Sequence, residues 1–182
     1  MVHLEQLCAV GLEPDLWRWS PTQIRTREDM RDYVDTALQA QMQGTALPFA
    51  TILKQTGSVV GSTRFANIDR QNRRVEIGWT WIGLPWQRRV VNTEAKYLML
   101  SHAFQLGCIR VEFKTDSLNE KSRQALLRIG AKEEGTFRNH MIVRDGRYRH
   151  SVYFSVIEIE WPEVKARLKE KLAATHPTGT GS

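Results

Sequence analysis

The chain has 182 residues, 41% of them hydrophobic and 25% charged, which is the composition of a globular protein large enough to bury a core. The formal net charge of +6 favours a negatively charged partner, such as a phosphorylated cofactor or RNA. The basic residues are dispersed, however, and lack the motif of a nucleic-acid-binding surface, so RNA is not the expected partner.

Cysteine usage and hydropathy restrict the setting in which the protein works. Cys8 and Cys108 have neither a metal-ligand spacing nor a disulfide framework, which predicts a reducing cytoplasm and no metal site. The first residues lack the basic and apolar regions of a leader peptide, and no apolar run approaches the length of a membrane span. We therefore expect a cytoplasmic protein without a membrane partner. It should have one domain over residues 1–174 and a flexible polar tail over residues 175–182.

The first half of the chain predicts two helices followed by three strands. Residues 3–10 form the first expected helix, and Thr22 or Thr26 caps a second helix that runs to Gln43. The expected strands cover residues 49–54, 59–68 and 74–81. In the third strand Val75 and Ile77 alternate with Glu76, so this carboxylate points to the opposite face of the sheet.

The second half of the chain alternates helices with strands. After the third strand, Ala95, Leu98, Met99, Ala103 and Leu106 recur at helical spacing, and Gly107 ends that helix. The elements expected next are a strand over residues 109–114, a helix from residues 116–119 to Gly130, a hairpin of residues 132–143 and 148–159 around a turn at 145–146, and a last helix over residues 161–172.

The segment from Pro85 to Lys96 joins the third strand to the next helix and carries Arg88 and Arg89. A helix start offers unpaired backbone N–H groups and the positive end of the helix dipole. With the charge of two arginines, this arrangement predicts a site for phosphate oxygens. The alternative is an ordinary strand-to-helix turn with two solvated arginines.

Four stretches of the chain carry a family resemblance: residues 75–79, 87–92, 119–122, and Gly130-Ala131 with the hairpin after it. In this order and spacing, over nearly the whole chain, they resemble the GNAT (GCN5-related) N-acetyltransferase superfamily. The runs at residues 92–97 and 107–111 look like its RimJ/RimL-like branch. The resemblance implies an α/β fold, the GNAT fold, with a mixed central sheet flanked by helices. Because the chain begins almost at the first helix, the first edge strand is expected to be missing, either through a truncated start or because the sheet lacks that strand.

The resemblance implies acetyl-CoA as the cofactor. The family loop follows the pattern Gln/Arg-x-x-Gly-x-Gly/Ala, and its backbone N–H groups hold the CoA pyrophosphate. Gln87 matches the first position, whereas Val90 and Asn92 replace the usual small residues, and glycine is the residue that lets backbone approach a ligand closely. Arg88 and Arg89 offset a poorer fit through charge-assisted contacts. The residues expected to bind the cofactor are Trp79, Thr80, Trp81, Gln87, Arg88, Arg89, Val90, Val91, Asn92, Thr93, Asn119 and Arg123.

The resemblance also implies where catalysis takes place. A strand bulge, here between Gly78 and Trp81, supplies the N–H group that polarises the thioester oxygen. The tyrosine that commonly protonates the leaving thiolate is replaced by Leu126. Ser122 is the candidate that remains for this role. The alternative for Ser122 is a first-turn helix residue that bonds to backbone.

Glu76 is the candidate general base, acting through a water on the substrate ammonium. A carboxylate in the middle of a strand is rarely placed without a partner. The alternative is therefore an ion pair across the sheet with Arg64, Arg73 or Arg74. Asn119 is expected to contact the pantetheine arm and also suits the N-cap of the following helix.

The expected function is transfer of an acetyl group from acetyl-CoA to a primary amine. The acceptor is the N-terminus of a protein or peptide, or a small amino compound. Val90 and the missing tyrosine favour the alternative, a non-catalytic acyl-CoA-binding or interaction module. A third alternative, an RNA-associated protein, is supported by charge alone. The sheet edge left by the missing strand favours association, so a homodimer is among the expected assemblies.

Overall fold

One mixed β-sheet runs through the computed structural model, which describes residues 2–144 and 146–175. Within these residues six strands lie in the order β1-β2-β3-β4-β6-β5. All neighbours are antiparallel except β3 and β4. The strands are β1 (Leu47–Ile52), β2 (Val59–Asp69), β3 (Arg74–Ile82), β4 (Arg110–Asp116), β5 (Lys132–Ile142) and β6 (Tyr148–Ile157).

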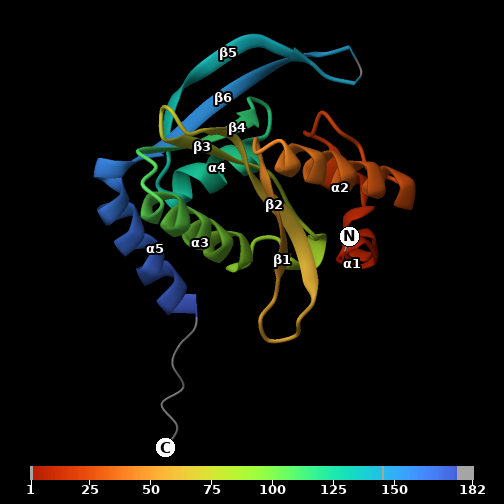
Figure 1. Ribbon diagram of the computed structural model, residues 1–182, viewed down its shortest axis with the longest axis horizontal. Helices are drawn as coiled ribbons and strands as arrows, with labels where there is room; N and C mark the ends of the chain where they lie inside the picture. The colour runs from red at the N-terminus through yellow and green to blue at the C-terminus, as the bar shows by residue number, and fades with distance from the viewer. Residues whose placement is uncertain (1, 145, 176–182) are drawn as a thin grey trace, which may run out of the picture.

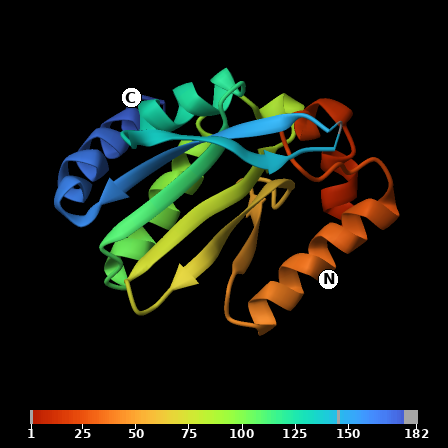
Figure 2. The same cartoon turned by 90° about the horizontal axis from the view of Figure 1, so that it is seen from above.

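Helices cover the two faces of the sheet unequally. The helices are α1 (Leu4–Gly11), α2 (Arg27–Met42), α3 (Val91–Gln105), α4 (Glu120–Ile129) and α5 (Trp161–Thr175). Helices α3, α4 and α5 lie together on one side of the sheet, and α1 and α2 lie on the other (Figures 1 and 2). Short 3₁₀ turns precede α2, α3 and α5 at residues 14–17, 84–86 and 158–160.

The two larger hydrophobic clusters of the described residues correspond to these two layers. The larger core joins α3, α4 and α5 to inward residues of the sheet such as Val75, Val111 and Phe154. The smaller core joins α1 and α2 to one end of the sheet, where Trp17 packs against Trp81. Because side chains alternate along each strand, the residues between the core positions point away from α3, α4 and α5. The orientation of Glu76 predicted from this alternation is confirmed.

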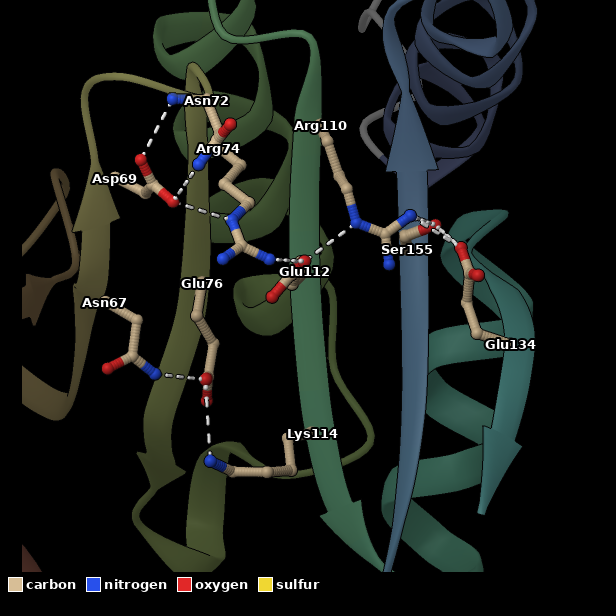
Figure 3. Close-up of polar contacts among 10 residues, drawn as sticks. All are labelled: Asn67, Asp69, Asn72, Arg74, Glu76, Arg110, Glu112, Lys114, Glu134 and Ser155. Carbon is tan, nitrogen blue, oxygen red and sulfur yellow. Dashed lines mark hydrogen bonds and ion pairs between the residues drawn. The ribbon is translucent and has the colours of Figure 1, made fainter. Parts of the chain in front are cut away.

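Charged side chains cross the middle strands on this second face (Figure 3). Glu112 of β4 accepts hydrogen bonds from Arg110 at 2.7 Å and from Arg74 at 3.5 Å, and Arg110 also reaches Glu134 at 2.7 Å. A sheet face with charged side chains of this kind is suited to contact with water rather than to burial in a core.

Local sequence signals set the ends of the helices. Thr26, rather than Thr22, is the N-cap of α2, and its hydroxyl accepts from the backbone N–H of Asp29 in a capping box. Asn119 caps α4 by accepting from the N–H of Ser122 at 3.1 Å. Gly130 ends α4 with φ of 97°, a left-handed conformation that favours glycine.

The expected strands and helices are confirmed, with three differences. Helix α3 begins at Val91 rather than near Ala95, so Val91, Asn92 and Thr93 lie in its first turn. Leu98 and Leu106 are exposed, while Lys96 is buried. Strand β1 begins two residues earlier than expected and ends before Lys54.

The ends of the sheet bear on the predicted missing strand. Strand β1 lies at one edge of the sheet, and none of residues 2–46 belongs to a strand.

Part of the predicted turn at residues 145–146, and the tail from residue 176, lie outside the described residues. Among the helices that the structure describes, none is long and apolar enough to cross a membrane.

Candidate active site

The parallel strands β3 and β4 stop pairing part-way along the sheet, and the region between their unpaired ends is here called the notch. The two strands pair over three positions, of which Glu76 opposite Glu112 is the last. Strand β3 continues to Ile82 and β4 continues to Asp116. A parallel pair that separates part-way along a sheet leaves backbone groups available to a ligand lying between the strands.

A β-bulge lies on β3 at the side of this notch. Ser62 pairs with Trp81 and Arg64 pairs with Gly78, so Thr63 of β2 stands opposite both Trp79 and Thr80. Trp79 has φ of 49°, which is uncommon for a residue with a bulky side chain. A bulge leaves its extra residue outside the hydrogen-bond ladder. The predicted bulge between Gly78 and Trp81 is therefore present. The Trp81 side chain points into the smaller core, so only the backbone of this residue is open to a ligand role.

The start of α3 lies at the end of the connection from β3. No side chain caps this helix at Val90, and the first backbone bond into it runs from the N–H of Glu94 to the Val90 carbonyl at 2.9 Å. The N–H groups of Val91, Asn92 and Thr93 thus have no protein acceptor among the described residues. Asn92 also has a buried Oδ1 without a hydrogen-bond partner.

The two arginines of the loop are exposed, whereas its glutamine makes a hydrogen bond to the protein. Arg88 and Arg89 are exposed, and Arg88 has φ of 59°. The side chain of Gln87 donates to the carbonyl of Ile82 at 3.0 Å, which fixes the loop against the end of β3. The two guanidinium groups therefore remain available to a phosphate, while Gln87 shapes the backbone.

Glu76 lies at the start of the notch, between β2 and β4 (Figure 3). Its side chain is buried, and its Oε2 accepts from Asn67 Nδ2 at 2.7 Å and lies 3.6 Å from Lys114 Nζ. Glu76 therefore has an ion-pair partner, as the alternative required, but the predicted partners Arg64, Arg73 and Arg74 are wrong and the partner is Lys114. The other oxygen, Oε1, leans over Gly78, where an added Cβ would lie 2.9 Å from it. Gly78 therefore leaves room for a carboxylate oxygen that points towards the bulge.

The candidate residues of α4 lie in its first turn. Ser122 is half-buried, and its hydroxyl has no hydrogen-bond partner among the described residues, so the predicted alternative of a bond to backbone is absent. Asn119 has the predicted capping role. Arg123 lies 3.4 Å from Glu120 and 3.3 Å from Glu133, so carboxylates already engage the guanidinium that was expected at the cofactor.

A buried lysine lies behind the bulge and was missed by the sequence analysis. Lys96 is 4% exposed, and its Nζ donates to Thr80 Oγ1 at 2.6 Å and to Thr63 Oγ1 at 3.4 Å. Loss of hydration on burial lowers the pKa of Lys96 from 10.5 to about 7. A signal was present: Lys96, Met99, Leu100 and Ala103 share one helical face, and the other three are apolar.

Comparison with known proteins identifies this arrangement. The family model described as "Acetyltransferase (GNAT) domain" matches residues 2–132, which is more than half of the chain. The chain belongs to the GNAT acetyltransferase family. A solved GCN5-related N-acetyltransferase from Brucella melitensis is 33% identical in sequence, with a TM-score of 0.87 over 100% of this chain and 81% of that one.

Other relatives connect this GNAT protein to named N-acetyltransferases. The Bacillus subtilis protein named "Putative ribosomal N-acetyltransferase YdaF" is 36% identical over 58% of this chain and 57% of that protein. "Uncharacterized N-acetyltransferase p20" of Bacillus licheniformis is 26% identical over 85% of this chain and 87% of that protein. The fold is also that of Mycobacterium smegmatis RimJ, solved with CoA-disulfide, at a TM-score of 0.76 and 21% identity over 93% of this chain and 83% of that one. The predicted resemblance to the GNAT superfamily is confirmed, and YdaF is in line with the RimJ/RimL-like branch.

The loop of this GNAT domain has an ordinary backbone at the position where the family pattern has glycine. Val90 has φ of −62° and ψ of −22°, ordinary helical values that valine adopts without strain. The left-handed residue of the loop is Arg88, two positions earlier. The backbone at position 90 therefore does not need a glycine for its conformation, and the Val90 departure is milder than the sequence pattern indicates.

Proposed function

We propose that this protein transfers the acetyl group of acetyl-CoA to a primary amine, either the N-terminus of a protein or peptide or a small amino compound. The observation that carries the proposal is the meeting of three features at one place. These are the β3–β4 notch, the bulge at Trp79 and Thr80 on its side, and the Glu76 carboxylate at its start. Acetyl transfer needs a polarised carbonyl oxygen beside a group that removes a proton from the amine.

The residues around the notch fit a CoA-type ligand. The uncapped start of α3 offers the N–H groups of Val91, Asn92 and Thr93 to a pyrophosphate, and Arg88 and Arg89 lie exposed beside them. The orphaned Oδ1 of Asn92 is an acceptor, so it suits an amide N–H or a hydroxyl of the ligand rather than a phosphate. Trp79 and Thr80 contribute backbone groups of the bulge.

Each candidate residue then has a role set by its position. Acetyl-CoA, when bound, supplies an activated thioester. Glu76 accepts a proton from the amine through Oε1, the oxygen that Asn67 and Lys114 leave open. The N–H groups of the bulge stabilise negative charge on the carbonyl oxygen. The Ser122 hydroxyl, which has no partner of its own in the described part of the chain, donates a hydrogen bond to the departing thiolate, which takes its proton from solvent.

Other features of the chain support the proposed compartment, assembly and partner. Cys8 and Cys108 are both free thiols in the structure, in keeping with the proposed reducing cytoplasm. The uncovered edge of β1 supports a homodimer as an assembly to be tested. The dispersed positive charge supports the CoA phosphates as its partner more than RNA.

Two measurements on the purified protein test the proposed function. Acetyl-CoA should raise the melting temperature, because a ligand that binds only the folded state stabilises it by mass action, about 2.7 kcal/mol at one hundred times Kd. Release of free CoA thiol should then require an amine acceptor. Stabilisation without thiol release across peptides, amino acids and other amines would support the non-catalytic acyl-CoA module. No stabilisation at millimolar acetyl-CoA would refute the cofactor.

Ser122→Ala should lower turnover about tenfold while leaving the affinity for acetyl-CoA nearly unchanged. A thiol is a moderately good leaving group with an ordinary pKa of about 8.5, so we expect an effect at or below the low end of general acid catalysis. Turnover is measured by thiol release and affinity by calorimetry. Ser58→Ala, in the distant turn between β1 and β2, is the matched control. Equal turnover in parent and Ser122→Ala would assign Ser122 to helix α4 alone.

A further inference from the structure

Arg64 is a buried arginine without an ion-pair partner in the described part of the chain. It is 5% exposed, its Nε has no hydrogen-bond partner, and it takes part in none of the ion pairs among the described residues. An ionised group removed from water without a partner is costly, so such groups in proteins are usually paired. The missing partner of Arg64 is therefore expected to come from a ligand.

Two aromatic rings determine how a ligand can approach this guanidinium. Its Cζ lies 4.9 Å from the ring centroid of Tyr33 on α2 and 4.9 Å from that of Trp79 on the bulge. Cation–π contacts of this kind stabilise the faces of the group but form no hydrogen bonds with its N–H groups. The hydrogen-bonding capacity that is left without a partner lies at the planar edge, where the N–H donors fork. A carboxylate fits that edge with two parallel bonds.

A cavity of about 260 Å³ adjoins Arg64. Its wall includes Tyr33 and Trp79, and two carboxylates of α2, Asp29 and Asp32, also line it. A polyanion such as a phosphorylated compound or a nucleic acid would meet these carboxylates. A molecule with one carboxylate and one ammonium group would instead find a cation at Arg64 and anions nearby.

The candidate base Glu76 does not line this cavity, but it lies near Arg64 on the sheet. Arg64 pairs with Gly78 across β2 and β3, and Glu76 is two residues from Gly78 on the same face of the sheet. Oε1 of Glu76 leans over Gly78, towards the position of Arg64. Diagonal neighbours in an antiparallel pair have Cα atoms about 7–8 Å apart. This separation is within the span of a small acceptor.

We propose that Arg64 binds the carboxylate of an acceptor whose reactive amine lies a few bonds away, near Glu76. The acceptor class is an aminocarboxylic acid, present either as a free amino acid or as an acidic N-terminal residue of a peptide. This inference rests on the proposed function for the amine transfer, whereas the carboxylate site is measurable without turnover.

Binding is measured first, by calorimetry with glycine, β-alanine and 4-aminobutyrate as probes in the presence of CoA. The parent should bind at least one of these acids, and the matching amide (glycinamide, β-alaninamide or 4-aminobutanamide) about ten- to a hundredfold more weakly, the value of a charge-assisted bond. The Arg64→Met variant should bind the acid and its amide with equal affinity. Arg64→Lys, which keeps the charge without the planar fork, should retain only part of it. Arg74→Met removes an exposed arginine of β3 and is the control.

Acetyl-transfer assays then distinguish a free amino acid from an acidic peptide as the acceptor. They also test the carboxylate site separately from the proposed acetyltransferase activity. Preference for the free acids identifies a small-molecule acceptor, and preference for Asp-Ala-amide over Asn-Ala-amide identifies an acidic peptide, provided that Arg64→Met abolishes the preference. Turnover of amides and acids with equal kcat/KM would overturn the carboxylate site and leave the acetyltransferase standing. Carboxylate binding with no turnover of any amine would overturn the acetyltransferase alone. No Arg64-dependent binding of any acid would overturn the carboxylate site, whatever the activity. A melting temperature close to that of the parent shows that each variant is folded.

Discussion

Lys96→Met should stabilise the folded protein, by about 5 kcal/mol at most, when unfolding is measured at or below pH 7. The pKa of Lys96 falls from 10.5 to about 7 on burial, and each unit corresponds to about 1.4 kcal/mol between the two protonation states. Methionine fills a similar volume and carries no charge to desolvate. The gain is reduced by the loss of the hydrogen bonds that Nζ donates to Thr80 and Thr63.

The pH dependence of this difference distinguishes desolvation from other causes. Below pH 7 the lysine is charged in both folded and unfolded chains, so the parent bears the full cost of burial. Between pH 7 and pH 10.5 the unfolded chain binds more protons than the folded chain, so the stability of the parent rises with pH. The advantage of Lys96→Met should therefore shrink through this window and disappear near pH 10.5.

Urea unfolding of parent and variant at pH 6, 7.5 and 9 measures the effect. Lys169→Met is the matched control, because it removes the same side chain from the exposed surface of α5 and should change the free energy of unfolding by less than about 0.5 kcal/mol. A Lys96→Met protein that is less stable than the parent by the same amount at all three pH values would show that the hydrogen bonds of Nζ outweigh its desolvation.

The sequence predicted the orientation of Glu76 but not the burial of Lys96, and this difference shows how far local patterns predict the site. Alternation along β3 was enough to place Glu76 on the face opposite Val75 and Ile77. Capping patterns likewise restricted the start of α2 to Thr22 or Thr26 and that of α4 to residues 116–119, because a cap depends only on residues three positions apart. These signals are local, and the structure confirms them.

The partners of the site residues could not be predicted in the same way. Glu76 meets Lys114 instead of an arginine, because the choice depends on how β3 and β4 are registered across a parallel pair. Burial of Lys96 depends on α3 packing against both β2 and β3 at the bulge. Arg64 is enclosed by residues of α2 and β3 that are distant in sequence. Register, bulges and enclosure are tertiary properties, so the chemistry they create became visible only in the fold.

Glu76→Gln should lower kcat/KM for a peptide acceptor about a hundredfold at pH 6.5. Gln preserves the size of the side chain and its contact with Asn67, but it cannot accept a proton from the amine. General base catalysis is typically worth a factor of about 10²–10⁴. A terminal amine has an ordinary pKa of about 7.7–8.0, so at pH 9 most of the acceptor is already neutral. The ratio of parent to variant should therefore fall to about ten or less at that pH.

The ion pair between Glu76 and Lys114 requires two controls. Glu112→Gln removes a partly buried, ion-paired carboxylate from the neighbouring strand on the same face, and its pH profile should follow that of the parent (Figure 3). The double variant Glu76→Gln/Lys114→Met removes the lysine charge that Glu76→Gln alone would leave unpaired. If the double variant is as slow as Glu76→Gln, the loss of rate is due to the missing proton acceptor and not to an unpaired charge. If the rate of Glu76→Gln is reduced by the same factor from pH 6.5 to 9, or if Lys114→Met restores it, Glu76 is a structural partner of Lys114. The proton then leaves the amine by another route.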